Sequence, residues 1–178
     1  MNRSAMVGAG ATIRTEELRD RRAVRALHES AFGGSVEADL VEALHRAAAA
    51  LVALVAELDR EVVGHILFSP VALEPATARH LAGLGPMAVA PHVQRRGIGS
   101  LLVREGLKRC AAASVDAVVV LGHAEYYPRF GFRPAHQLGL RCDFDAPPEV
   151  FMALELEPGS LSDVSGLVRY HDAFRGEA

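Results

Sequence analysis

The sequence lacks tryptophan and contains only two cysteines, Cys110 and Cys142, among its 178 residues. Two cysteines do not make the disulfide framework of a secreted domain, and neither lies in a C-x-x-C or Cys/His cluster typical of zinc sites. No run reaches the roughly 18 apolar residues of a membrane span, and residues 1–11 lack the apolar core of a signal peptide. These absences predict a cytoplasmic protein with no metal site and no membrane contact.

Excess positive charge is also absent, because 19 Lys and Arg stand against 22 Asp and Glu, for a net charge of -3. Broad nucleic-acid binding normally needs a basic surface, so we expect no nucleic-acid partner. Half of the residues are hydrophobic and 23% are charged, and the length suits one globular domain. We assign residues 1–10 to a flexible leader, 11–157 to this domain and 158–178 to a C-terminal extension.

The spacing of apolar residues predicts the order of helices and strands. Val24, Leu27 and Ala31 recur at helical spacing. Gly83, Gly85 and Pro86 are poor residues for a regular strand and predict a bulge or a close approach of the backbone to a ligand. Helices are expected over residues 16–32, from an N-cap at 35 toward 47, and from 101 to about 112, with a short helical turn at 125–130. Strands are expected over residues 11–14, 51–57, 62–69, 80–89, 117–121, 132–134 and 150–156, with an added edge strand at 167–170. Residues 70–79 are expected to form a loop or an irregular strand extension.

A basic, glycine-rich turn at residues 94–100 separates an apolar strand from a helix start. The first N–H groups of a helix have no intrahelical partner and lie at the positive end of its dipole. Gly97 and Gly99 let the backbone turn sharply and approach a ligand, and Arg95 and Arg96 add positive charge. The turn is therefore predicted to bind a pyrophosphate.

Two motifs resemble those of the GNAT superfamily of acyl-CoA N-acyltransferases. Residues 89–99 are similar to its V-x-P-x-x-[QR]-x-x-G-x-[GA] signature, and residues 127–132 are similar to its Tyr-x-x-x-Gly-Phe element. The Tyr126–Tyr127 pair resembles an uncharacterised bacterial-type subgroup. The resemblance covers residues 11–156 and implies an α/β (α+β) fold, with a mixed, mostly antiparallel central sheet flanked by helices and with splayed central strands.

The resemblance further implies that acetyl-CoA binds between the splayed strands as the acyl donor. Met87, Ala88 and Val89 would offer backbone groups to the pantetheine arm. The residues implied to bind the pyrophosphate are Gln94, Arg95, Arg96, Gly97, Ile98, Gly99 and Ser100.

The implied reaction is direct attack of an amine on the thioester. Tyr127 matches the family's thiolate-protonating tyrosine, and Tyr126 is its alternative because a small helix shift would exchange them. Relatives often carry a base on the strand before the phosphate turn, but residues 80–89 contain no Asp or Glu. His65, His123 and Glu125 are the alternative bases, although the apolar run around His65 favours a structural, hydrogen-bonded histidine.

Two classes of function fit these residues. The first is an acetyl-CoA-dependent N-acetyltransferase acting on a small-molecule or peptide amine, as a monomer or homodimer. The second is a non-catalytic acyl-CoA-binding or regulatory module. Tyr127 favours the enzyme, and the missing strand carboxylate favours the module. The expected acceptor side at residues 32–35 carries no charge pattern that selects one class of amine.

Overall fold

A computed structural model describes residues 5–6 and 10–176 of the chain. Most of the leader predicted over residues 1–10 therefore lies outside the described residues. Within it, Ala5–Met6 form a short strand, β1, that pairs with β2 (Thr12–Thr15). Strand β2 corresponds to the first predicted strand, displaced by one residue.

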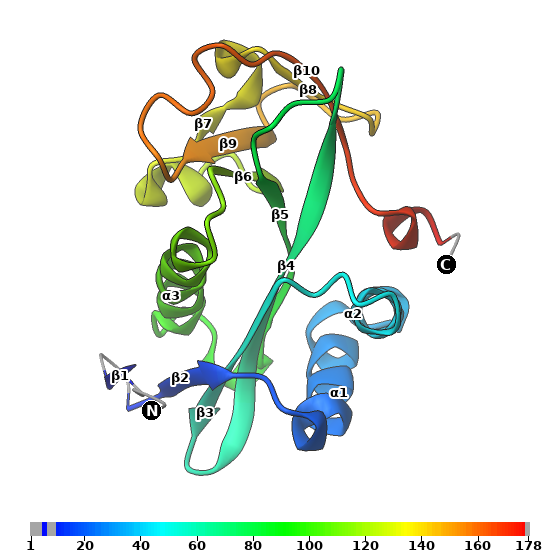
Figure 1. The fold of residues 1–178 in the computed structure, drawn as a ribbon. Coiled ribbons are helices and arrows are strands. Elements are labelled where there is room, and N and C mark those ends of the chain that lie inside the picture. Colours follow the sequence, from blue (N-terminus) through cyan, green and yellow to red (C-terminus); the bar gives the residue numbers. More distant parts are fainter. Residues whose placement is uncertain (1–4, 7–9, 177–178) are drawn as a thin grey trace.

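The central sheet has the strand order β1-β2-β3-β4-β5-β6-β9-β7 (Figure 1). The strands that follow β2 in this order are β3 (Val52–Leu58), β4 (Glu61–Glu74), β5 (Leu81–Val89), β6 (Ala117–Leu121), β9 (Phe151–Glu155) and β7 (Arg133–Pro134). Neighbours run antiparallel except β5 and β6, which are parallel. The predicted mixed, mostly antiparallel sheet is confirmed.

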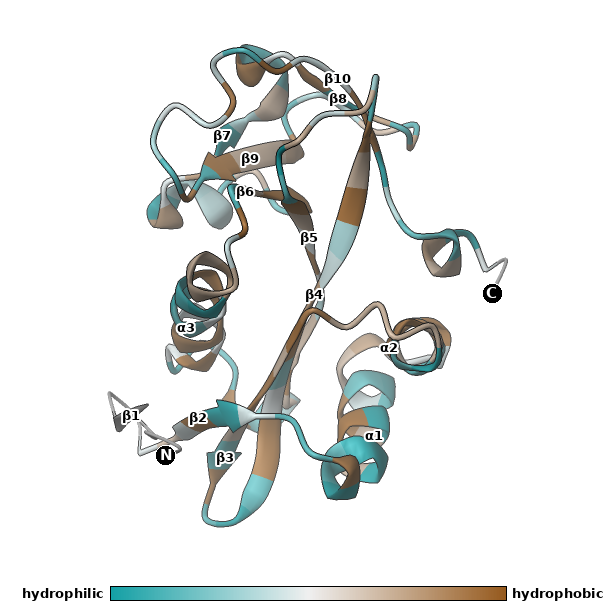
Figure 2. Cartoon of the chain, in the orientation of Figure 1, coloured by the Kyte–Doolittle hydropathy of each residue, from teal (hydrophilic) through white to brown (hydrophobic). Residues whose placement is uncertain are grey.

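Helices cover both faces of the sheet. The helices α1 (Arg21–Phe32) and α2 (Val36–Arg46) lie on one face, and α3 (Ile98–Ala112) lies on the other (Figure 1). Most of α1 is hydrophilic, and it buries only Val24, Leu27 and His28 (Figure 2). None of the helices in the described ranges is long and apolar enough to cross a membrane.

The first helix begins at Arg21 and not at Glu16 as predicted. The Glu16 N–H donates to the Ala53 carbonyl at 2.9 Å, which keeps this residue with the sheet. A 3₁₀ turn over Leu18–Asp20 follows and precedes the α-helix. The helix ends where predicted, because Gly33 takes a left-handed φ of 75°.

The sheet opens at its centre because β5 is irregular in its pairing with both of its neighbours, β6 and β4. Pairing with β6 runs from Leu81 opposite Ala117 to Leu84 opposite Val120, but β5 continues to Val89. The two strands therefore part after Leu84. The register with β4 also shifts at Gly85 and Pro86, where the sequence predicts a bulge. The predicted splayed central strands are thus present.

The C-terminal part differs in part from the prediction. Strand β4 continues to Glu74, in agreement with the irregular strand extension that was one of the two expectations for residues 70–79, whereas its pairing with β5 ends at Val71. Backbone groups beyond that point need other partners. Strand β10 (Gly166–Arg169) supplies them and also pairs in parallel with β8 (Leu140–Cys142), a strand that the sequence did not predict. Strand β10 is therefore not an edge strand, which corrects the prediction for residues 167–170.

Candidate active site

The predicted phosphate turn forms a cradle at the N-terminus of α3. Gly97 precedes the helix with a left-handed φ of 88°, and Arg95 also has a positive φ of 61°. The Gln94 side chain donates to the Val89 carbonyl at 3.0 Å and holds the turn against β5. Gln94, Arg95, Arg96 and Gly97 are exposed, Gly99 and Ser100 are half-buried, and Ile98 is buried. The turn therefore presents backbone N–H groups and two guanidinium groups to solvent.

The last residues of β5 lead from the sheet to this cradle. On one side, Met87, Ala88 and Val89 pair with Ile66, His65 and Gly64 of β4. On the other side, no strand in the described ranges pairs with these three residues, because β6 has parted from β5. Their backbone groups on that edge are therefore available to an extended ligand, as a further strand would be.

The two tyrosines occupy different environments beside the parted strands. Tyr127 begins a 3₁₀ turn, Tyr127–Phe130, and is only 7% exposed, whereas Tyr126 is half-buried. Their rings meet edge to face with centroids 5.1 Å apart. The Tyr126 hydroxyl lies 3.0 Å from the position that a Cβ at Gly99 would occupy. Tyr126 therefore borders the cradle, and Tyr127 lies in the interior.

Packing positions the ring of Tyr127. It contacts Phe132 with centroids 5.6 Å apart, and it lies so close to Gly122 that a Cβ there would come within 2.5 Å of the ring. Burial, and secondarily Tyr126, raise the pKa of Tyr127 to about 12. The phenol is therefore protonated at neutral pH and able to donate a proton.

His123 and Glu125 are exposed residues that follow β6. The His123 carbonyl accepts from the Tyr126 N–H at 3.0 Å and so helps to form the turn that carries the tyrosines. The two side chains border an open cavity of about 640 Å³. The lining residues are Leu121, Gly122, His123, Ala124, Glu125, Tyr126, Arg129 and Val150.

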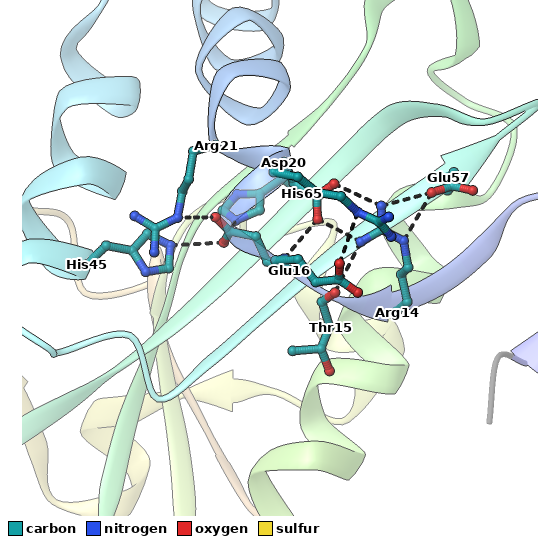
Figure 3. A network of polar contacts seen from close by, with 10 residues as sticks. Arg14, Thr15, Glu16, Asp20, Arg21, His45, Glu57 and His65 are labelled. Carbon is teal, nitrogen blue, oxygen red and sulfur yellow. Dashed lines mark hydrogen bonds and ion pairs between the residues drawn. The ribbon is translucent and has the colours of Figure 1, made fainter. Parts of the chain in front are cut away.

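His65 lies in a buried polar network between the sheet and α1 and α2 (Figure 3). It is fully buried, its Nε2 is 3.1 Å from Glu16 Oε2, and its Nδ1 is 2.9 Å from His28 Nε2. Glu16 Oε2 is also 2.9 Å from His45 Nε2. Glu16 Oε1 forms an ion pair with Arg21 Nε at 2.9 Å, without the alignment of a good hydrogen bond. Because both ring nitrogens of His65 are engaged, neither is directed at a substrate.

The network combines the buried charge of Glu16 with the neutral imidazoles of His28 and His65. Burial acts to raise the pKa of Glu16, but hydrogen bonds from His45 and His65 outweigh it and lower the pKa to about 2. Burial, with a smaller effect of His65, lowers the pKa of His28 to about 3. Burial also lowers the pKa of His65. At neutral pH Glu16 is therefore ionised, and His28 and His65 are uncharged.

Sequence reasoning did not find Glu16 or His28. His28 had a detectable signal, because it lies next to Leu27 and four residues after Val24 on the buried side of α1. A polar side chain at such a position needs a hydrogen-bond partner. Across residues 5–6 and 10–176, no group of three or more His, Cys, Asp or Glu is placed to hold a metal ion.

Acid should destabilise the wild-type fold more than it destabilises a His28→Gln variant. The pKa of His28 is about 3 in the folded protein against 6.5 normally, so the unfolded chain binds more protons between these values. Neutral His28 contributes fully to the free energy of unfolding above about pH 6.5, and this contribution is lost as the pH falls toward 3. At pH 4 the loss is on the order of 3 kcal/mol. Urea unfolding at pH 7 and pH 4 measures this difference. Equal losses in the two proteins would contradict it.

Comparison with known proteins identifies relatives of this chain. The model of the Acetyltransferase (GNAT) family matches residues 21–132. The uncharacterized N-acetyltransferase YhbS of Escherichia coli K12 is 34% identical over 163 residues, which cover 91% of this chain and 97% of that protein. The crystal structure of Escherichia coli YhbS in complex with CoA has a TM-score of 0.90 at 33% identity, over 97% of this chain and 96% of that one.

A second solved structure is also similar to this chain over most of its length. A GNAT family acetyltransferase from Brucella melitensis, in complex with acetyl-CoA, has a TM-score of 0.78 at 37% identity, over 92% of this chain and 97% of that one. The segment matched by the family model contains the cradle at α3, the last residues of β5 and the tyrosine pair. The resemblance inferred from the two motifs is confirmed. The chain belongs to the GNAT family of acetyltransferases.

Proposed function

We propose that this protein transfers an acetyl group from acetyl-CoA to a primary amine by direct attack on the thioester. The observation that carries the proposal is that three features of the structure adjoin one another: an unpaired strand edge, the cradle and Tyr127. The unpaired edge of Met87–Val89 leads into the cradle at Gly97–Ser100, and Tyr127 lies beside the parted strands. The relatives crystallised with CoA and acetyl-CoA support the choice of donor.

The donor is held by backbone groups more than by side chains. The pantetheine arm would lie along Met87, Ala88 and Val89 and hydrogen-bond to their free edge. The pyrophosphate would accept hydrogen bonds from the first N–H groups of α3, at the positive end of its dipole. Arg95 and Arg96 are exposed at the same turn and add charge attraction. The small residues Gly97 and Gly99 leave the backbone accessible.

In the reaction, the amine nitrogen forms a bond to the thioester carbon, and the carbon–sulfur bond then breaks. Holding the two reactants together can lower the barrier by several kcal/mol. The attacking nitrogen would lose one proton to solvent, and the protonated phenol of Tyr127 would donate its proton to the departing CoA thiolate and regain one from solvent. Tyr126 is the alternative acid, although its hydroxyl lies near Gly99 at the cradle. The acceptor is a small-molecule or peptide amine.

A second candidate function is an acyl-CoA-binding module without catalysis. The observation that favours it is the absence of Asp and Glu from Leu81–Val89, because a carboxylate there is the base in many relatives. Exposed His123 and Glu125 at the cavity after β6 are candidate bases that act through water.

Thiol release separates the two functions. Wild-type protein is incubated with acetyl-CoA and a panel of small amines, amino acids and short peptides, and free CoA thiol is measured. We expect amine-dependent release that follows the uncharged fraction of the amine, because only the free base attacks the thioester. Calorimetry with acetyl-CoA is the control for donor binding. Binding without release on every amine would favour the module, and absence of binding would refute both functions.

A further inference from the structure

The two central strands part at a fork, and the acyl end of the donor would lie there. Strands β5 and β6 pair last at Leu84 opposite Val120, and from this fork the free edge of β5 continues to Val89, next to the cradle. The edge is about 16 Å long at 3.3 Å per residue. With the pyrophosphate at the cradle and the pantetheine arm along the edge, the thioester reaches the far end of the edge, at Leu84. The groups around Leu84 therefore bound the acyl group.

The face of the fork toward α3 is filled by packed side chains. Leu84 is directly opposite Phe68 of β4, and residues paired in this way project to the same face of the sheet. Leu84 is only 4% exposed, and Phe68 is fully buried. The Phe68 ring occupies the position that a Cβ at Gly106 of α3 would take. This face therefore leaves no room for an acyl chain.

The opposite face of β5 is bare beside Leu84, because both neighbours of this residue are glycines. The space at Gly85 is open: within the described part of the chain, and apart from the two residues next to Gly85, no heavy atom lies within 4 Å of the position of a Cβ. The space at Gly83 is closed, since a Cβ there would come within 2.6 Å of the Tyr170 ring and 3.0 Å of Val71. The room at the fork thus ends at Tyr170.

The ring of Tyr170 is held firmly in this position. Tyr170 directly follows β10, which pairs with β4, and the chain then runs from β10 toward α2 (Figure 1). The ring contacts Phe144 and Phe174, with centroids 5.6 and 5.0 Å away. Only 6% of Tyr170 is exposed. The ring therefore cannot turn away from Gly83 without disrupting this aromatic cluster.

The hydroxyl of Tyr170 can be considered separately from its ring. It is buried and has no hydrogen-bond partner within the described chain. Burial, with smaller effects of Cys142, Asp143 and Tyr127, raises the pKa of Tyr170, so the phenol is protonated at neutral pH. The effect of Tyr127 also indicates that the two phenols lie near each other. Because the hydroxyl has no partner, its removal leaves the packing of the ring intact.

We propose that Tyr170 sets the length of the acyl group that this protein accepts, because its ring closes the space behind an acetyl group at the fork. The proposal rests on the acetyltransferase function proposed above, and it assigns Tyr170 to donor specificity, not to catalysis. Gly83 and Gly85 are about 7 Å apart at 3.3 Å per residue. An acetyl group fits in the open space at Gly85, whereas a chain with two further methylenes would have to enter the volume that the ring fills.

Binding of acyl-CoA without an amine tests the proposal. The affinities of acetyl-CoA and butyryl-CoA are measured by isothermal titration calorimetry. The two ligands share the whole of CoA, so the ratio of their affinities depends on the acyl group alone. We expect wild type to bind butyryl-CoA at least about 10-fold more weakly than acetyl-CoA, because a closed apolar pocket rejects an extra methylene by roughly 10–200-fold.

Tyr170→Leu should abolish this discrimination. The side chain becomes shorter, and the vacated volume is bordered by Val71 and by Val119, which is directly opposite Gly83. Such apolar walls favour the burial of additional methylenes. We expect Tyr170→Leu to bind butyryl-CoA at least as tightly as acetyl-CoA. The matched control is Tyr170→Phe, which keeps the ring, removes only the unpartnered hydroxyl and should retain the wild-type ratio.

Equal affinities of wild type for acetyl-CoA and butyryl-CoA would overturn the proposal, as would the wild-type ratio in folded Tyr170→Leu or a lost preference in Tyr170→Phe. The thermal midpoint and the affinity for CoA itself show whether each variant is folded. If Tyr170→Leu does not fold, Tyr170→Met replaces it with the same expected result, because the flexible methionine can move aside. Failure of wild type to bind acetyl-CoA, or to acetylate any amine, would instead overturn the proposed function, so the two failures are distinguishable.

Discussion

Glutamate in place of Gly99 is expected to weaken acetyl-CoA binding by at least about 100-fold. The new carboxylate would stand at the N-terminus of α3, where the pyrophosphate is proposed to bind, and would repel it. It would also meet the Tyr126 hydroxyl, which lies 3.0 Å from the position of a Cβ at this residue. A negative charge at a helix N-terminus is favourable by about 0.3–1 kcal/mol, so the variant should still fold.

Ala112→Glu is the matched control for this prediction. It adds the same charge to an exposed position at the other end of α3, about 20 Å away at 1.5 Å per residue. Isothermal titration calorimetry should give wild-type affinity for Ala112→Glu and no measurable heat for Gly99→Glu. Unchanged affinity in Gly99→Glu would show that the cradle does not bind the donor.

Removal of the Tyr127 hydroxyl should lower kcat by about 10³-fold, within the range typical of a lost general acid. Tyr127→Phe retains the ring and its packing against Gly122 and Phe132, so the binding of acetyl-CoA and the thermal midpoint should change little. Because the pKa of Tyr127 is raised to about 12, wild-type activity should show no loss of this acid up to pH 10. Thiol release with the best amine measures kcat.

Tyr126→Phe distinguishes between the two tyrosines. Its hydroxyl lies near Gly99 at the cradle, so we expect this variant to affect the KM for acetyl-CoA more than kcat. If the loss of kcat appears only in Tyr126→Phe, the assignment of Tyr127 as the acid is refuted. If neither variant loses activity, the thiolate leaves without a protein acid.

Local sequence patterns predicted the turn at residues 94–100 and the end of β5. The glycines shape the backbone of the turn in which they stand, so their spacing is sufficient to locate the cradle. The same holds for the bulge at Gly85 and Pro86, because proline cannot donate to the neighbouring strand. The short strand β8 was not predicted, since it depends on β10 for its pairing and has little apolar pattern of its own.

The buried polar network depends on contacts between distant parts of the chain. Glu16, His28 and His65 come from three elements, and their separations of 37 and 49 residues leave no motif in the sequence. The apolar run around His65 predicted a buried, hydrogen-bonded histidine, but not its partners. The catalytic role of His65 stays a prediction.

The sequence by itself determined the family, the site of the cradle and the pair of tyrosines, because each is encoded by neighbouring residues. Tertiary structure alone decided the roles within the buried network. Whether a histidine presents a donor or a lone pair depends on the charge of the group across from it. For His28 that group is Glu16, reached through His65, and only the fold brings them together. Short-range patterns report the geometry of the backbone, whereas proton positions follow from long-range contacts.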